Sequence, residues 1–489
     1  MRFSLNKYKI IAFYTIAFFF IIFNSWIIIK EENLLFNLFP IALIVFLAMF
    51  FALDKVLLFS VFLVPFSVPL KTFVPGLEFN VDLPTEPIFV GILFIFILKQ
   101  LQDRYFDTKL LKHPVSIALY IYLFWKFVTV FTSTMPIVSL KAFIASLWFI
   151  VPFYFLISQL FKKDKKKIYN FLWLYIIPFI IIIIYTLIKH SARGFTQSTA
   201  NFIVNPFYND HTSYGAVLAM FIPVLIGFVF SKDLKKYVRG WSFVVLVLFI
   251  VALIFSYTRA AWVSMLVGLG VYVILKLKIK LKYILTVAVV MLGLFFAFQE
   301  QIFMSLSGNR QDSSTDFSEH IKSISNITTD ASNLERINRW NCAVRMFEEK
   351  PIFGWGPGTY QFNYAPFQFS YEKTIVSTNA GDYGNAHSEY LGELSESGLL
   401  GMLSFTALII IIVVTGVRSY QRAKSKLIKT LSMSLLVGLI TYLAHAFLNN
   451  FLDIDKVAVP FWGFVAALVI IDLYINKEEE KQCVENKEQ

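Results

Sequence analysis

Long apolar stretches recur along the whole chain, and they restrict the possible folds more than any other feature. A helix needs ~20 mostly apolar residues to cross a bilayer, because the hydrocarbon core is ~30 Å thick. By this criterion the sequence holds about fourteen candidate spans, or about twelve without the short third and fourth. The candidate spans are Ile10–Ile29, Leu34–Leu53, Val56–Leu70, Pro87–Leu98, Val115–Phe131, Ala142–Leu160, Ile168–Ile188, Tyr214–Phe230, Trp241–Tyr257, Ala260–Leu275, Tyr283–Phe303, Leu399–Val417, Thr430–Leu448 and Val457–Ile475.

Composition excludes a soluble chain. Hydrophobic residues make up 57% of the sequence and charged residues only 16%, whereas a soluble domain carries ~25% charged residues. Backbone groups in lipid must form their hydrogen bonds within the segment, which favours helices. We therefore predict an all-α fold: a polytopic transmembrane helical bundle of about 12–14 spans with one large outer loop that contains an amphipathic helix.

The net charge of +12 would point to nucleic acid in a soluble protein. In a membrane protein, Lys and Arg instead concentrate in the cytoplasmic loops. If both termini are cytoplasmic, every strongly basic short loop falls on the cytoplasmic side, including the lysines of residues 162–167, 232–236 and 276–282. We therefore interpret these clusters as topology signals and expect no nucleic-acid partner.

One polar segment, residues 305–397, interrupts the apolar pattern on the predicted outer side. Within it, apolar residues recur at spacings of three and four from Leu334 to Phe347, which predicts an amphipathic helix. Arg336 and Arg339 lie three residues apart and are therefore neighbours on this helix. Pro351 is expected to end it.

A glycine-rich stretch, GWGPGTY, follows this helix. The spacing of Gly354, Gly356 and Gly358 resembles that of a phosphate-binding loop, but no strand precedes it and no lysine follows it. We therefore interpret it as a plain turn. Further along, Gly398 and Gly401 fall in the first turns of a span, where small residues allow close helix packing.

Other charged residues lie at predicted outer ends of spans. Arg259 separates two apolar runs, and a charge there indicates a functional site, with snorkelling to the interface as the alternative. Asp210 and His211 lie at the mouth of another span, and Asp453 lies in a short outer loop. The remaining charged residues at or near these ends are His445, Asp455, Lys456, Lys126 and Lys141, of which the two last are expected to be structural.

Arginines and histidines thus share one predicted side of the membrane. Several arginines there suit a polyanion presented from the lipid, because guanidinium groups bind phosphate oxygens in a fork. A histidine such as His387 could take a proton from an acceptor hydroxyl. No cluster has the spacing of a closed metal site, and the acidic residues are too scattered to predict Mg²⁺ binding.

These residues resemble the motifs of the O-antigen ligase and O-antigen polymerase superfamily of bacterial membrane glycosyltransferases. His387-Ser388, nine residues and then Gly398-x-x-Gly401 match one motif of that family, and Glu396 fits its Glu-x-Gly. The stretch from Arg336 through Trp340 and Ala343 to Gly354-x-Gly356 and the SYTRAAW run around Arg259 match others. The resemblance extends from about Trp241 to Phe451.

The resemblance implies a glycosyltransferase of the bacterial cytoplasmic (inner) membrane with a large periplasmic loop. It implies transfer of a glycan from undecaprenyl diphosphate, with inversion and without a metal ion or cofactor. The acceptor would be lipid A core in lipopolysaccharide assembly or another surface polysaccharide. The implied site roles are catalytic for His387, Arg336 and Arg259, substrate-binding for Arg339, His211, Glu396 and Asp453, and structural for Gly354, Gly356, Gly398 and Gly401.

The expected organisation has an N-terminal transmembrane part (1–240) and a ligase-like core (241–456) with the loop 305–397. A last transmembrane helix (457–475) and a cytoplasmic tail (476–489) follow. A ligase is slightly favoured over a repeat polymerase, because the motif around His387 gives the best match. A small-anion transporter of the same superfamily and a scaffolding membrane protein are the alternatives from other functional classes.

Overall fold

The computed structural model describes residues 2–31, 35–72, 81–103, 107–280, 331–373, 377 and 384–476. The predicted span Tyr283–Phe303, the first part of the long loop and the C-terminal tail lie outside these residues. Within them the chain is almost entirely helical, which confirms the all-α prediction.

Nine helices of the described ranges are long and apolar enough to cross a membrane, so this is a multi-pass membrane protein. One of the nine, Pro136–Lys163, runs through α7 (Pro136–Ile150), a π-helical turn (Val151–Leu156) and α8 (Ile157–Lys163). The others are α6 (Pro114–Phe131), α9 (Lys166–Ser191), α11 (His211–Phe230), α12 (Lys236–Phe255), α13 (Arg259–Lys276), α18 (Glu389–Arg422), α19 (Lys426–His445) and α20 (Asp455–Ile470), which a π-helical turn (Ile471–Ile475) continues.

The chain divides into two compact units, Met1–Val56 and Leu57–Gln489. The first unit contains α1 (Arg2–Glu31), a 3-10 turn (Leu35–Leu38) and α2 (Phe39–Phe51). The Asn24 amide of α1 donates a hydrogen bond to Asn37 of the 3-10 turn at 2.6 Å. The predicted domain boundaries at 240 and 456 follow function rather than compactness, and they stay predictions.

The predicted span Val56–Leu70 was wrong. The chain there forms α3 (Leu53–Leu63) and a 3-10 turn (Val64–Phe66) that contains a proline. Strand β1 (Val68–Pro69) then pairs antiparallel with β2 (Asp82–Leu83), with Val68 opposite Leu83. A proline lacks the backbone N–H that a continuing helix needs, so the apolar run turns back instead of crossing. Helix α4 (Thr85–Asp103) covers the predicted span Pro87–Leu98.

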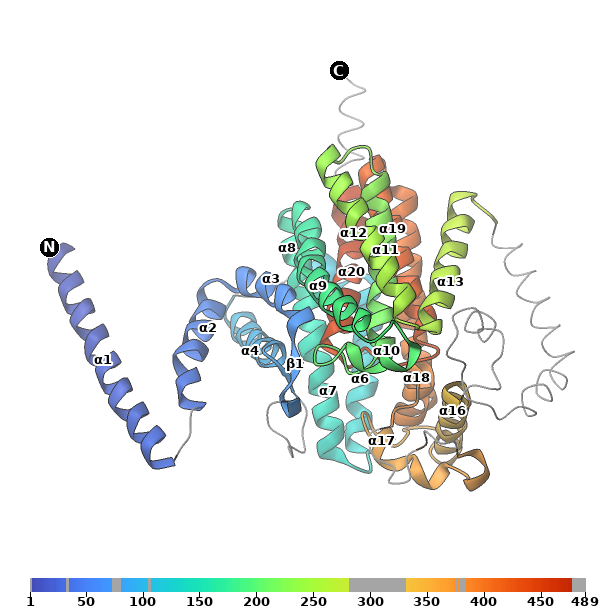
Figure 1. The fold of residues 1–489 in the computed structure, drawn as a ribbon, viewed down its shortest axis with the longest axis horizontal. Helices are drawn as coiled ribbons and strands as arrows, with labels where there is room; N and C mark the ends of the chain where they lie inside the picture. Colours follow the sequence, from blue (N-terminus) through green and yellow to red (C-terminus); the bar gives the residue numbers. More distant parts are fainter. Residues whose placement is uncertain are drawn as a thin grey trace, which may run out of the picture. The chain divides into compact units, whose positions relative to one another are not determined.

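Helix α20 forms the centre of the second unit and is buried along its whole length. It packs against α7, α8, α9, α11, α18 and α19 (Figure 1). A helix that is apolar on every side is stable only where other helices surround it. Glycines allow the closest approaches: a Cβ atom on Gly438 of α19 would lie 2.5 Å from the Met220 carbonyl oxygen of α11.

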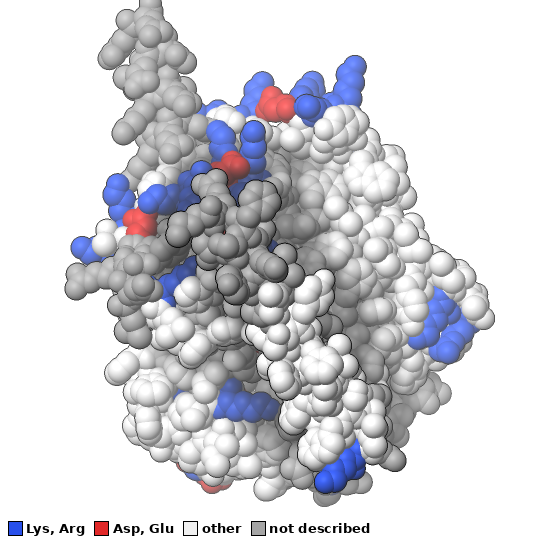
Figure 2. All heavy atoms as spheres, turned by 90° about the vertical axis from the view of Figure 1, so that its left-hand side faces the viewer, with Lys and Arg blue, Asp and Glu red and all other residues white. Residues whose placement is uncertain are grey.

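The second unit has two ends with different structures. One, the His387 end, carries α16 (Ala331–Glu349), α17 (Tyr360–Asn363) and 3-10 turns at Ala365–Phe367 and Ser370–Glu372 (Figure 1). The other, the Asp472 end, carries the short helix α5 (Thr108–Leu111). Most Lys and Arg side chains on the face in Figure 2 lie toward its upper end, away from the His387 end. This distribution agrees with the predicted orientation, which stays a prediction.

Candidate functional site

His387 immediately precedes the N-cap of α18, and its backbone is held on both sides. Its N–H donates to the Asn385 side chain at 3.1 Å, and its carbonyl accepts from Trp340 Nε1 of α16 at 3.2 Å. Its φ of +48° is unusual for a residue other than glycine. Ser388 then caps α18 by accepting from the Leu391 N–H. The sequence around the histidine therefore presents its ring in a fixed direction.

The His387 ring lies in surroundings that favour its neutral form. Burial lowers the pKa of His387 to about 4, and the positive charges of Arg336 and Arg339 contribute to the decrease. The carboxylates of Glu335 and Asp210 act in the opposite direction. Its Nδ1 atom is buried and has no hydrogen-bond partner among the described residues. A neutral imidazole can accept a proton at neutral pH.

The two arginines of α16 have different surroundings. Arg339 is tied down: its Nε donates to Glu335 at 2.8 Å, and its guanidinium stacks on the Tyr364 ring at 3.8 Å from the centroid. Burial lowers the pKa of Arg336, and the Asp210 carboxylate partly offsets this.

Helices α11 and α13 bring Arg259 to the same end. Asp210 caps α11 by accepting from the Thr212 and Ser213 N–H groups, each at 2.8 Å. Thr258, which precedes α13, donates to the His211 carbonyl at 2.8 Å. Arg259 then begins α13, and its charge repels that of Arg336. The structure thus places Arg259, Arg336 and His387, the three predicted catalytic residues, at one end of the bundle.

His445 joins these residues. His445 ends α19, is fully buried and contacts Asn449 at 3.0 Å. It interacts electrostatically with Arg336, Asp210 and His211. Asp453 lies in the connection between α19 and α20, and its charge acts on Glu389 of α18, two residues from His387.

Three glutamates follow His387 on one face of α18: Glu389, Glu393 and Glu396. We call them the glutamate stripe, since spacings of four and three place them in line. Glu389 Oε1 accepts from the Phe451 and Leu452 N–H groups at 2.8 Å.

The Tyr442 hydroxyl of α19 donates to the same Glu389 oxygen at 2.7 Å. Glu393 Oε1 accepts from Tyr122 at 2.5 Å and from Lys126 at 2.9 Å, both on α6. The stripe therefore ties α18 to α6, α19 and the α19–α20 connection. The sequence prediction missed Glu389 and Glu393, although acidic residues at helical spacing beside an apolar span were a usable signal.

The side chain of Glu396, the third residue of the glutamate stripe, binds the turn formed by the glycine-rich stretch GWGPGTY, which we call the glycine turn. Its two carboxylate oxygens accept from the Gly358 N–H at 2.7 Å and the Tyr360 N–H at 2.9 Å. Its carbonyl accepts from the Gly356 N–H at 2.7 Å. These donors are therefore already used, which agrees with a plain turn rather than a phosphate-binding loop. The contacts favour a structural role for Glu396 over the predicted substrate-binding role.

Glycines allow α18 and the glycine turn to approach closely. Gly354, Gly356 and Gly398 have positive φ values of +67°, +108° and +69°. A Cβ atom on Gly398 would lie 2.1 Å from the Ile352 carbonyl oxygen. Gly398 also interrupts the helical backbone of α18, and a Cβ on Gly401 would lie 2.2 Å from that of Ser397. The positive φ values and the close approaches explain why glycine occupies the four predicted motif positions.

Residues 244–406 match the family model described as O-antigen ligase. This part of the chain is an O-antigen ligase-like region. The match confirms the resemblance to the O-antigen ligase and polymerase superfamily, and it supports a role in polysaccharide assembly. No curated protein matches the chain. The O-antigen ligase-like region includes Arg259, Arg336, Arg339, His387 and the glutamate stripe, whereas His211, His445 and Asp453 lie outside it.

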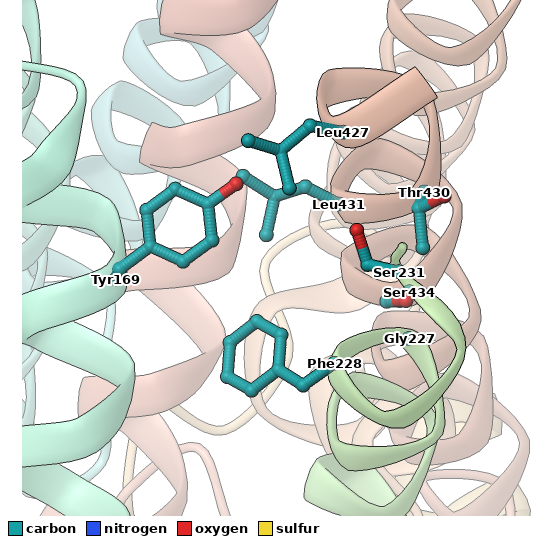
Figure 3. Close-up of a pocket in the computed structure, with 8 residues that line it drawn as sticks. All are labelled: Tyr169, Gly227, Phe228, Ser231, Leu427, Thr430, Leu431 and Ser434. Atoms are coloured by element: carbon teal, nitrogen blue, oxygen red, sulfur yellow. The ribbon is translucent and has the colours of Figure 1, made fainter. Parts of the chain in front are cut away.

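Neither a metal-ligand cluster nor a large internal cavity adds to this site within the described residues. Within the residues described above, no three His, Cys, Asp or Glu side chains are grouped as metal ligands would be. A hollow between α9, α11 and α19 is lined by Tyr169, Phe228, Ser231 and Leu431 (Figure 3). Its volume of about 10 Å³ admits a single water molecule. It also lies at the end of α11 opposite His211, so it is not a candidate substrate site.

Proposed function

We propose that this protein transfers a glycan from undecaprenyl diphosphate to a sugar acceptor at the periplasmic face of the bacterial inner membrane, with both termini cytoplasmic. The observation that carries this proposal is the convergence of Arg259, Arg336 and a neutral His387 at one end of a membrane bundle. The O-antigen ligase-like region around these residues supports it.

In the proposed reaction, an acceptor hydroxyl attacks the anomeric carbon of the donor sugar. The new carbon–oxygen bond forms on the face opposite the diphosphate, which leaves with its bonding electrons, and the anomeric centre is inverted. His387 accepts the hydroxyl proton. Arg259 and Arg336 stabilise the negative charge on the departing diphosphate, a contribution that is large in a water-poor site. The step needs no metal ion.

A transfer assay with purified protein in liposomes tests this proposal. The donor is an undecaprenyl-diphosphate-linked glycan, and the readout is the amount joined to an acceptor glycolipid. Arg259→Ala is expected to lower transfer by ~100-fold or more, as removal of a transition-state charge partner does in other enzymes. Arg193→Ala, an exposed arginine between α9 and the short helix α10 (Gln197–Ile203), is the control and should retain full activity. Equal activity of both variants would contradict the proposal.

Ligase activity is proposed over repeat polymerisation, because the motif around His387 gives the best match to a ligase pattern. The surface glycan of a deletion strain distinguishes the two. Loss of all capped acceptor indicates a ligase, whereas acceptor capped with a single repeat indicates a polymerase. A deletion strain with normal glycan that has lost uptake of a small anion would favour a transporter.

A further inference from the structure

The ring of His445, the last residue of α19, is buried and held in a fixed direction. The His445 carbonyl accepts from the Leu448 and Asn449 N–H groups at 2.9 and 3.1 Å, so the chain turns back over the ring. The Asn449 amide nitrogen then lies 3.0 Å from Nε2, and the Phe451 ring packs against the imidazole at 5.8 Å between centroids.

The contact with Asn449 determines which ring nitrogen of His445 carries the proton. An amide nitrogen can only donate, so Nε2 is the acceptor of this hydrogen bond. In the neutral ring the proton is therefore on Nδ1, which points away from Asn449. Nδ1 is buried and has no hydrogen-bond partner among the described residues. A buried donor without a partner costs free energy, which a hydrogen bond to a ligand oxygen would offset.

The His445 ring lies in the same polar region as the proposed base. Arg336 of α16 acts electrostatically on both His445 and His387. The Glu389 N–H, two residues after His387, donates to the Ala446 carbonyl at 2.9 Å. The segments that carry the two histidines are therefore joined directly, and the unused donor of His445 belongs to the end of the bundle where Arg336 lies.

A second buried histidine gives a comparison. His190 of α9 also has a buried Nδ1 without a partner within the described ranges, and its Nε2 lies 3.0 Å from the Thr196 carbonyl oxygen. Its ring contacts three aromatic rings, those of Phe195, Phe255 and Tyr257. The two histidines thus differ in their surroundings, since His190 lies among aromatic rings and His445 lies in the field of Arg336.

We propose that His445 is a substrate-binding residue whose Nδ1–H donates to a phosphate oxygen of the lipid diphosphate. The inference rests on the proposed function, which supplies a diphosphate beside Arg336. An ionised phosphate oxygen only accepts hydrogen bonds, so it matches a donor next to a guanidinium group. Asn449 is then a positioning residue, because it selects the tautomer in which Nδ1 donates. His387 keeps the separate role of proton acceptor.

Two variants of similar shape test which nitrogen of His445 matters. His445→Asn places an amide at the position of Nδ1 and loses the contact with Asn449. His445→Gln places its amide at the position of Nε2 and loses Nδ1. The readout is the affinity for undecaprenyl diphosphate, without a glycan, of protein in liposomes.

We expect His445→Gln to weaken this binding by ~10- to 100-fold, as loss of a hydrogen bond to a charged group does, and His445→Asn by less than ~3-fold. The reverse order or equal affinities would overturn the inference. The matched controls are His190→Asn and His190→Gln, and both should bind like the unaltered protein.

Unfolding temperatures show whether each variant is folded. If His445→Gln did not fold, His445→Asn would decide alone: near-normal affinity supports the Nδ1 contact, and loss of binding by the folded variant overturns it.

Transfer assays separate this inference from the proposed function. In His445→Gln, KM for the glycan donor should rise while KM for the acceptor stays unchanged. A rise in the acceptor KM alone would overturn the assignment to a phosphate oxygen. If the unaltered protein transferred no glycan, the proposed function would be wrong, and the order of diphosphate affinities in the two variants would still decide the role of His445.

Discussion

The two ends of the helical bundle use charge in opposite ways. At the Asp472 end, one buried carboxylate is surrounded by basic groups: Asp472 accepts from Arg418 Nε at 2.9 Å and lies 3.5 Å from both His113 and Arg422. At the His387 end, the arginines repel one another, while the nearby glutamates bind neighbouring elements.

We infer from this difference that the Asp472 end serves mainly stability and the His387 end mainly function. The Asp472 cluster joins α6, α18 and α20 with charges that satisfy each other within the protein. At the His387 end, the charges of Arg259 and Arg336 repel each other, and the glutamate stripe holds the surrounding segments in place. We expect substitutions at the first end to change mainly stability and substitutions at the second to change mainly transfer.

The largest expected effect on transfer comes from replacing His387, and His113 at the Asp472 end serves as its comparison. His387→Ala removes the proposed base and should lower transfer by ~10²- to 10⁴-fold with little change in thermal stability. His113→Ala should leave transfer within a few-fold of the unaltered protein and lower the unfolding temperature. Transfer assays and thermal unfolding of both purified variants check this pair. A stable, fully active His387→Ala protein would break the comparison.

A glycine pair tests whether the turn beside α18 depends on close approach. A Cβ on Gly356 would lie 2.0 Å from Ser133 Oγ, whereas one on Gly194 meets nothing within 4 Å, and both positions have positive φ. Gly194→Ala should therefore cost only ~1 kcal/mol of backbone strain. Gly356→Ala adds a clash and should cost a further ~1–3 kcal/mol. Equal unfolding free energies would show that the turn is not packed as described.

Substitutions in the glutamate stripe are expected to have smaller effects on transfer and stability. Glu389→Gln keeps an oxygen that accepts the same hydrogen bonds, so transfer should fall by less than ~10-fold. Glu389→Ala leaves the Phe451 and Leu452 N–H groups without their acceptor, which costs ~1–3 kcal/mol for each buried group. Urea unfolding of both variants measures the difference. Identical stability of the two would rule out this anchoring role.

The smallest expected change concerns pH. His387 is neutral above its pKa of about 4, whereas an unperturbed histidine titrates near ~6.5. Between pH 8 and pH 5.5, kcat/KM should therefore change by less than about twofold, where an unperturbed base would lose about tenfold. Because the folded pKa lies below the unfolded one, stability contributed by neutral His387 is lost as pH falls below ~6.5.

A variant that removes one positive charge tests the cause of the low pKa of His387. Arg336→Gln removes a positive neighbour that lowers the pKa of His387, so the acid limb should move upward toward pH 6.5. The shift is independent of how far the substitution lowers the rate itself. A limb that stays in place would show that Arg336 does not act on His387.

The sequence predicted the features that depend on local pattern. Apolar length gave the helices, and the spacing of His387, Gly398 and Gly401 located the O-antigen ligase-like region. The prediction of a span at Val56–Leu70 was wrong because an apolar run with a proline near its end is also compatible with a buried turn. Glu389 and Glu393 were missed because their partners come from α6, α19 and a distant connection. Such pairings depend on tertiary packing.

Undecaprenyl diphosphate binding tests the central claim most directly, namely that the His387 end holds the lipid diphosphate. Its affinity is measured for the unaltered protein, for Arg336→Ala and for Arg422→Ala at the Asp472 end. A charge-assisted contact to phosphate is worth ~1.5–3 kcal/mol, so Arg336→Ala should weaken binding by ~10- to 100-fold. Arg422→Ala should bind like the unaltered protein. Equal affinity of Arg336→Ala and Arg422→Ala would contradict this account.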